Sequence, residues 1–181
     1  MSRLAHGRLY AAFVAAVFFA VPASAEPFEA KVIGVIDGDT LDVLQIAGER
    51  KKPLRVRLVG IDAPEKAQAF GAVAREQLSR LAYGRMGSLS CRSEAERYGR
   101  SLCLVRVDGV DVGQRMIELG LAWHFKRYAN TQPREEAASY AASESLARAA
   151  KLGLWRDLGT VAMPVPPWEW RRATAADSAH L

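Results

Sequence analysis

Short runs of apolar residues broken by polar ones predict five β-strands between residues 28 and 107. Side chains of a strand point to its two faces in turn, so a run rich in Val, Ile and Leu and bounded by turn residues is typical of a strand. The runs are Phe28–Ile36, Leu41–Ile46, Leu54–Val59, Ser88–Arg92 and Leu102–Val107. In the third run, Arg55 and Arg57 share one face. Val56 and Leu58 share the other, which we expect to face the core.

Turn residues separate these runs. Asp37-Gly38-Asp39 lies between the first two and predicts a hairpin. Gly48–Lys52 is a polar turn before the third strand, and Asp108-Gly109 follows the fifth.

Apolar residues at helical spacing predict about three helices. The first is Glu65–Leu81, with Pro64 in its first turn. The second is capped by Asp111 and runs through Leu119. The third opens at Gln132-Pro133 and continues to about residue 152. The tail over 163–170 is rich in proline and tryptophan, and we expect it to be extended, packed on the body and without a chemical role.

Five strands interrupted by one helix and followed by two more favour an α+β fold with a mainly β core. The prediction is a five-stranded oligonucleotide-binding (OB) barrel with about three flanking helices. Strands and helices do not alternate regularly, which argues against a parallel α/β sheet. We expect one domain over residues 26–158 and a tail over 159–181.

The first 25 residues have the pattern of a secretory signal peptide. Arg3 and Arg8 form a basic start, Leu9–Val21 is apolar, and Ala23-Ser24-Ala25 suits a cleavage site. An uncleaved membrane anchor is the alternative, although the apolar run is shorter than the roughly 20 residues a spanning helix needs. We expect a periplasmic or secreted protein without stable membrane association after cleavage, and a monomer.

Charge and cysteine content narrow the function further. The net charge of +5 falls to +3 once the two arginines of the signal are removed, which is compatible with a polyanionic partner. Cys91 and Cys103 suggest a disulfide in an exported protein, with two buried thiols as the alternative. Outside the signal, the histidines are His124 and His180, so neither a zinc site nor histidine-centred hydrolysis is favoured.

Carboxylates and arginines gather at the ends of the predicted strands. They are Asp37, Asp39, Arg57, Asp62, Glu65 and Arg100. Carboxylates from two strand ends can converge on a hard cation such as calcium. A further carboxylate could take a proton from water attacking phosphorus, and two arginines could bind phosphate through paired hydrogen bonds. These are the parts needed for phosphodiester cleavage.

Each of these residues also has an ordinary structural interpretation. Aspartates are common in Asp-Gly turns, and Glu65 could simply complement a helix dipole. The arginines could be exposed strand or turn residues. Only the joint occurrence of all six favours a reaction.

The combined motif resembles the signature of the staphylococcal nuclease-like (thermonuclease) family. The pieces that carry the resemblance are Asp37-Gly38-Asp39-Thr40, Arg57 with Asp62-Ala63-Pro64-Glu65, Tyr98-Gly99-Arg100, Leu119-Gly120-Leu121-Ala122 and Gly153-Leu154-Trp155. The resemblance covers roughly residues 28 to 157. The resemblance implies an OB-fold barrel and calcium-dependent cleavage of DNA and RNA.

The resemblance also implies a metal site. Asp39 and Asp62 would hold calcium together with the backbone carbonyl of Ala63, and Asp37 and Thr40 would support these ligands. The staphylococcal enzyme has threonine in place of Ala63, a change that a carbonyl ligand survives. An all-oxygen ligand set would also suit magnesium or manganese.

By the same resemblance, Glu65 would be the general base, and Arg57 and Arg100 would bind the phosphate and stabilise the transition state. Tyr98 and Tyr128 would line the nucleotide pocket. The loop after Glu65 looks shorter than in the staphylococcal enzyme. The alternatives are a non-catalytic OB-fold module that binds nucleic acid or protein, and an exported structural calcium-binding protein.

Overall fold

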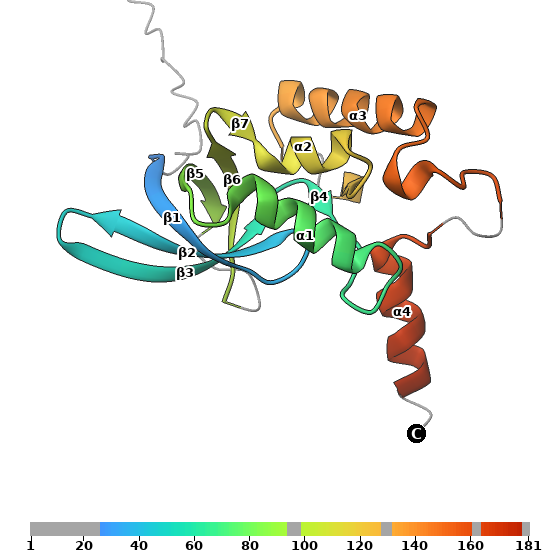
Figure 1. Cartoon of the computed structure of the whole chain (residues 1–181), viewed down its shortest axis with the longest axis horizontal. Coiled ribbons are helices and arrows are strands. Elements are labelled where there is room, and N and C mark those ends of the chain that lie inside the picture. The colour runs from blue at the N-terminus through green and yellow to red at the C-terminus, as the bar shows by residue number, and fades with distance from the viewer. Residues whose placement is uncertain (1–25, 94–98, 128–131, 161–163, 179–181) are drawn as a thin grey trace, which may run out of the picture.

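A closed five-stranded barrel forms the centre of the computed structural model, which describes residues 26–93, 99–127, 132–160 and 164–178 (Figure 1). The strands are β1 Phe28–Val35, β2 Thr40–Ala47, β3 Arg50–Leu58, β4 Ile61–Asp62, β5 Met86–Ser93, β6 Ser101–Val107, β7 Val110–Asp111 and β8 Trp123–His124. The helices are α1 Gly71–Ala82, α2 Val112–Glu118, α3 Arg134–Ala149, α4 Pro167–Ser178 and the 3-10 turn η2 Gly153–Trp155. The predicted signal peptide and His180 lie outside the described residues.

Antiparallel pairing in the order β3-β2-β1-β5-β6 builds the barrel, and parallel pairing of β3 with β6 closes it. The five predicted strands and the OB-type barrel are therefore confirmed. The turn before β3 is only two residues long, because Ala47 already pairs with Arg50. Alternate residues of each strand fill the interior, among them Leu41, Val43 and Val56, which are completely buried.

The β1–β2 hairpin carries the first motif to the barrel wall. A methyl group on Gly38 would lie 2.6 Å from the Cβ of Ala63 and 2.7 Å from the Cβ of Ala74. Only glycine therefore lets this turn approach both β4 and α1 so closely.

Helix α1 begins at Gly71, so the predicted start at Glu65 is wrong and Pro64 is not in its first turn. Residues 65–70 form a loop in which Gln68 N donates to Glu65 O (2.9 Å) and Gly71 N donates to Gln68 O (2.9 Å). Phe70 has φ 67°, and a side chain on Gly71 would collide with the carbonyl of Glu65. The loop folds back on itself, and this leaves Glu65 outside the helix.

Helices α2 and α3 lie together over one end of the barrel (Figure 1). The predicted cap of α2 is confirmed, because Asp111 Oδ1 accepts from the backbone N–H groups of Gly113 and Gln114. Its other oxygen accepts from the Tyr140 hydroxyl of α3 at 2.9 Å. Burial is the main reason why the pKa of Asp111 is raised, and burial likewise raises the pKa of Tyr140, with Asp111 adding to it.

Cys91 and Cys103 form a disulfide between β5 and β6, where they stand directly opposite each other. The bond joins neighbouring strands of the barrel. Cys103 is completely buried in the core.

The sequence suggested an extended tail over 163–170, and this is wrong for residues 167–170, which form the first turn of helix α4. The helix points away from the barrel (Figure 1). Its first turn packs against the body: Trp168 lies edge-on to Trp123 with ring centroids 6.3 Å apart and near Phe125 at 5.6 Å. Residues 171–176 are exposed. None of the helices in the described ranges is long and apolar enough to cross a membrane.

Candidate active site

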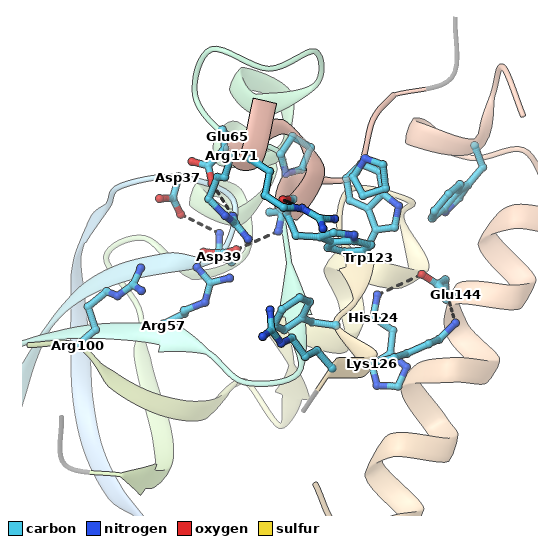
Figure 2. A pocket seen from close by; sticks show the side chains of 18 of the residues that line it. Asp37, Asp39, Arg57, Glu65, Arg100, Trp123, His124, Lys126, Glu144 and Arg171 are labelled. Atoms are coloured by element: carbon cyan, nitrogen blue, oxygen red, sulfur yellow. Dashed lines mark hydrogen bonds and ion pairs between the residues drawn. The ribbon is translucent and has the colours of Figure 1, made fainter. Parts of the chain in front are cut away.

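A cleft of about 1320 Å³ lies where the β1–β2 hairpin and the segment after β4 face β8 and the first turns of α4 (Figure 2). One side carries carboxylates and arginines, and the other carries aromatic and basic side chains. Six residues predicted for the site line this cleft: Asp37, Asp39, Arg57, Ala63, Glu65 and Arg100. Tyr98 and Tyr128 lie outside the described residues.

Asp39 closes the hairpin with its side chain almost completely buried. Its Oδ2 accepts from the backbone N–H of Ala63 at 2.9 Å, and its Oδ1 accepts from the Thr40 hydroxyl at 3.0 Å. The Asp39 N–H donates to Asp37 Oδ1 at 3.1 Å. Asp37 and Thr40 therefore hold Asp39 in place. Burial raises the pKa of Asp39 to about 7, although Arg57 opposes the shift.

Asp62 ends the short strand β4, which pairs with β8 and places Asp62 opposite Trp123. Its side chain is completely buried and does not line the open cleft, although its Oδ1 accepts a hydrogen bond from Arg57, which does line the cleft.

Arg57 joins the two aspartates. Its Nη1 donates to Asp39 Oδ1 at 3.1 Å, and its Nη2 donates to Asp62 Oδ1 at 2.8 Å. Burial lowers the pKa of this guanidinium, but the charges of Asp39 and Asp62 outweigh burial and the net pKa is raised. One planar, permanently charged group thus fixes the relative position of the two carboxylates.

Glu65 stands at the rim of the cleft, on the loop before α1. Its backbone N–H donates to Gln68 Oε1 at 3.1 Å. Its side chain is 37% exposed, so water can reach the carboxylate. Arg100 precedes β6 and lines the same cleft; Figure 2 shows its side chain on the same side as Arg57.

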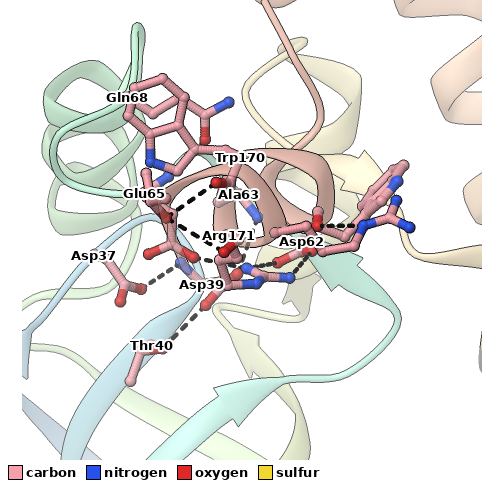
Figure 3. Close-up of polar contacts among 12 residues, drawn as sticks. Asp37, Asp39, Thr40, Asp62, Ala63, Glu65, Gln68, Trp170 and Arg171 are labelled. Carbon is pink, nitrogen blue, oxygen red and sulfur yellow. Dashed lines mark hydrogen bonds and ion pairs between the residues drawn. The ribbon is translucent and has the colours of Figure 1, made fainter. Parts of the chain in front are cut away.

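Arg171 of α4 is a site residue that the sequence analysis missed. Its Nη2 donates to Asp62 Oδ2 at 2.7 Å, and its Nη1 donates to Glu65 Oε1 at 2.6 Å and to Asp62 Oδ1 at 3.2 Å (Figure 3). Hydrogen bonding to Asp62 is the main cause of its raised pKa. The prolines followed by a run without glycine could have indicated helix α4. No local pattern could have indicated that Arg171 contacts Asp62, which lies 109 positions away.

The opposite side of the cleft combines aromatic rings with positive charge. Trp123, Phe125 and Trp168 lie beside Lys126 and Arg148. Glu144 of α3 organises this side, because it accepts from the backbone N–H of His124 and from Lys126 Nζ at 2.8 Å. Rings that can stack on bases next to cations that can bind phosphate suit a nucleic-acid strand.

The carboxylates offer only oxygen donors, the ligand type that hard divalent cations prefer. Asp39 and Asp62 converge on one guanidinium, and Asp62 and Glu65 converge on another, so the site already attracts positive charge. No cluster of three or more His, Cys, Asp or Glu side chains among the described residues is placed to hold a metal. The carboxylate oxygens are suitable ligands for a divalent cation. While Arg171 is bound to them, however, these carboxylates are not grouped around a single cation position.

Comparison with known proteins gives consistent matches. The sequence model of the family described as staphylococcal nuclease homologue matches residues 55–157. A micrococcal nuclease of Shigella flexneri is 36% identical over 182 aligned residues, which cover 96% of both chains. A protein of Escherichia coli named ParB is 38% identical over 182 residues, or 95% of both chains. An uncharacterized endonuclease of Escherichia coli is 37% identical over 154 residues, which cover 84% of this chain and 91% of that protein.

Proposed function

The chain belongs to the staphylococcal nuclease family and is a nuclease, and from this premise we propose that it is an exported, calcium-dependent hydrolase of phosphodiester bonds in DNA or RNA. The observation that carries the proposal is the convergence of four charged side chains. Asp39, Arg57 and Glu65 line one cleft, and the buried carboxylate of Asp62 lies beside it, bonded to Arg57. Three separate elements bring these residues together, the β1–β2 hairpin, β3 and the segment from β4 onward. A merely structural role would not require a buried carboxylate pair next to an exposed third carboxylate.

In the proposed reaction, Glu65 accepts a proton from a water molecule as the water oxygen forms a bond to phosphorus. The bond from phosphorus to the leaving oxygen breaks, and that oxygen takes a proton from solvent. Glu65 suits this role because its carboxylate is accessible to water at the rim of the cleft.

The two arginines would stabilise the charge that develops on the phosphoryl oxygens. Arg57 is held rigidly by two carboxylates, so it would not have to reorganise during the reaction. Arg100 lies on the same side of the cleft and would bind the phosphate with it.

Asp39, Asp62 and the carbonyl of Ala63 would hold the calcium ion. When bound, a divalent cation supplies positive charge that polarises a phosphoryl oxygen. The hydrogen bonds from Ala63 and Thr40 keep the Asp39 carboxylate oriented for this purpose. The aromatic and basic side of the cleft would hold the strand on either side of the scissile bond.

Export is supported by the signal-like pattern of residues 1–25 and by the Cys91–Cys103 disulfide, a bond that persists mainly in oxidising compartments. Cleavage after Ala25 would release a protein that begins at Glu26.

The experiment is cleavage of single-stranded DNA and RNA by the purified protein in calcium and then in EGTA. Cleavage that stops in the chelator supports the proposal. A folded protein that binds the strands with equal affinity in both buffers and never cleaves them would instead be a binding module.

A further inference from the structure

Arg171 occupies the carboxylates that the proposed reaction needs. Its guanidinium lies against Asp62 and Glu65 and forms three hydrogen bonds with them (Figure 3). The contact joins residues 106 and 109 positions apart, so it is a tertiary contact and not a local feature of α4.

The carboxylate of Asp62 has few lone-pair sites left for another cation. Its Oδ1 already accepts from Arg57 and Arg171, and its Oδ2 accepts from Arg171. Each carboxylate oxygen has about two lone-pair sites, so only one site of Asp62 is unused by these contacts. Asp62 is completely buried, and solvent therefore screens these charges weakly.

The balance of charges also shows that little negative charge is left for another cation. Three carboxylates, Asp39, Asp62 and Glu65, face the two guanidinium groups of Arg57 and Arg171. A divalent cation entering this group would meet a positive charge already in place. Arg57 is enclosed in the barrel wall at 16% exposure, whereas Arg171 is 42% exposed and is the one that can leave.

The way α4 is attached also permits departure. Its first turn is anchored by Trp168 against Trp123, and Gln68 Nε2 donates to the carbonyl of Val165 just before it. Residues 171–176 of the helix are exposed, and α4 points away from the barrel (Figure 1). Beyond the anchor, the contact is thus mainly electrostatic, and the Arg171 side chain can swing out while the anchor stays.

We propose that Arg171 is a built-in competitor of the divalent cation: it neutralises Asp62 and Glu65 in the metal-free protein and is displaced when the cation binds. The proposal rests on the proposed function, because it takes Asp62 as a metal ligand. The tail of this nuclease would then set the calcium concentration at which the site becomes competent.

The test is calcium binding, measured by titration calorimetry without nucleic acid. Arg171→Ala should bind calcium about tenfold more tightly than the unaltered protein, an effect within the range typical of coupled binding equilibria. Arg171→Gln should behave alike, and circular dichroism will show that both variants are folded. Arg172→Ala is the matched control: it removes the same charge from the same helix, but Arg172 Nε donates to the carbonyl of Trp168 and its loss should change affinity less than about twofold.

Unchanged or weaker calcium binding in both Arg171 variants would overturn the proposal, as would equal tightening in Arg172→Ala. Weaker binding would instead make Arg171 a group that organises the site. A DNA cleavage assay run on the same samples separates the two levels. If the unaltered protein cleaves DNA but the Arg171 variants bind calcium with the same affinity as it does, only the proposed role of Arg171 as a competitor is wrong. If the Arg171 variants bind calcium more tightly but no sample cleaves DNA, the competition by Arg171 is supported and the proposed nuclease reaction is wrong.

Discussion

Replacing Arg57 with methionine should destabilise the metal-free protein far more than the same replacement two positions earlier in β3. Arg57 lies 3.1 Å from Asp39 and 2.8 Å from Asp62, and the side chains of both partners are at most 4% exposed. Removing one partner of a buried ion pair costs about 3–5 kcal/mol, because the remaining charge stays buried without compensation.

The lower end of that range is expected here. Arg171 still contacts Asp62, and Asp39 can take up a proton because its pKa is already about 7. A loss of about 3 kcal/mol corresponds to a melting temperature lower by roughly 6–12 °C in a protein of this size.

The assay is thermal unfolding followed by circular dichroism in EGTA, with Arg55→Met as the matched control. Arg55 pairs with Asp42 at 2.8 Å, but its side chain is 52% exposed, and such exposed pairs contribute little. Arg55→Met should therefore leave the melting temperature nearly unchanged. Equal losses in the two variants would refute the argument that removing Arg57 leaves buried charge without compensation.

Three further predictions concern the turn, the disulfide and the second arginine. Gly38→Ala should cost about 1–3 kcal/mol of unfolding free energy, because the new methyl would overlap Ala63 and Ala74; urea unfolding that shows no loss would contradict the close approach. Reduction of Cys91–Cys103 should remove about 3 kcal/mol, as expected for a link across 12 residues, and thiol titration should find two free thiols only after reduction; two thiols before reduction would contradict the bond. Arg100→Ala should weaken nucleotide binding and slow cleavage, each by about 10- to 100-fold. Arg106→Ala, on the exposed side of β6, should change neither, and equal effects of the two substitutions would show that Arg100 is not part of the site.

The barrel strands could be predicted from the sequence because their signal is local. Alternation in β3 separates Val56 and Leu58 from the arginines, and the structure buries the first pair as expected. The cap of α2 was equally predictable, since Asp111 bonds to backbone groups two and three residues ahead.

The start of α1 could not be predicted in the same way. Apolar spacing favoured a helix from Glu65, but the backbone of residues 65–70 turns back under the constraint of a positive φ at Phe70. Gly71 marks this turn, because a side chain there would collide with the carbonyl of Glu65, but a single glycine does not interrupt the apolar spacing that favours the helix. The consequence is functional, because it places Glu65 on a loop at the rim.

The site could be predicted in part. The motifs identified Asp39, Arg57, Glu65 and Arg100, which the structure brings to one cleft. Arg171 was missed because its partners are remote in sequence and the proline-rich tail suggested an extended segment. An ion pair between distant residues is set by tertiary packing, which spacing along the chain does not reveal.

The most direct test of the nuclease mechanism is the cleavage rate of Glu65→Gln on single-stranded DNA at saturating calcium. Glu169→Gln, an exposed acid in the first turn of α4, is the matched control. We expect Glu65→Gln to slow cleavage by at least about a hundredfold, as the loss of a general base does, with the protein still folded. The control should cleave at the unaltered rate. A Glu65→Gln protein that cleaves DNA as fast as the control would contradict the central claim that Glu65 takes the proton from the attacking water.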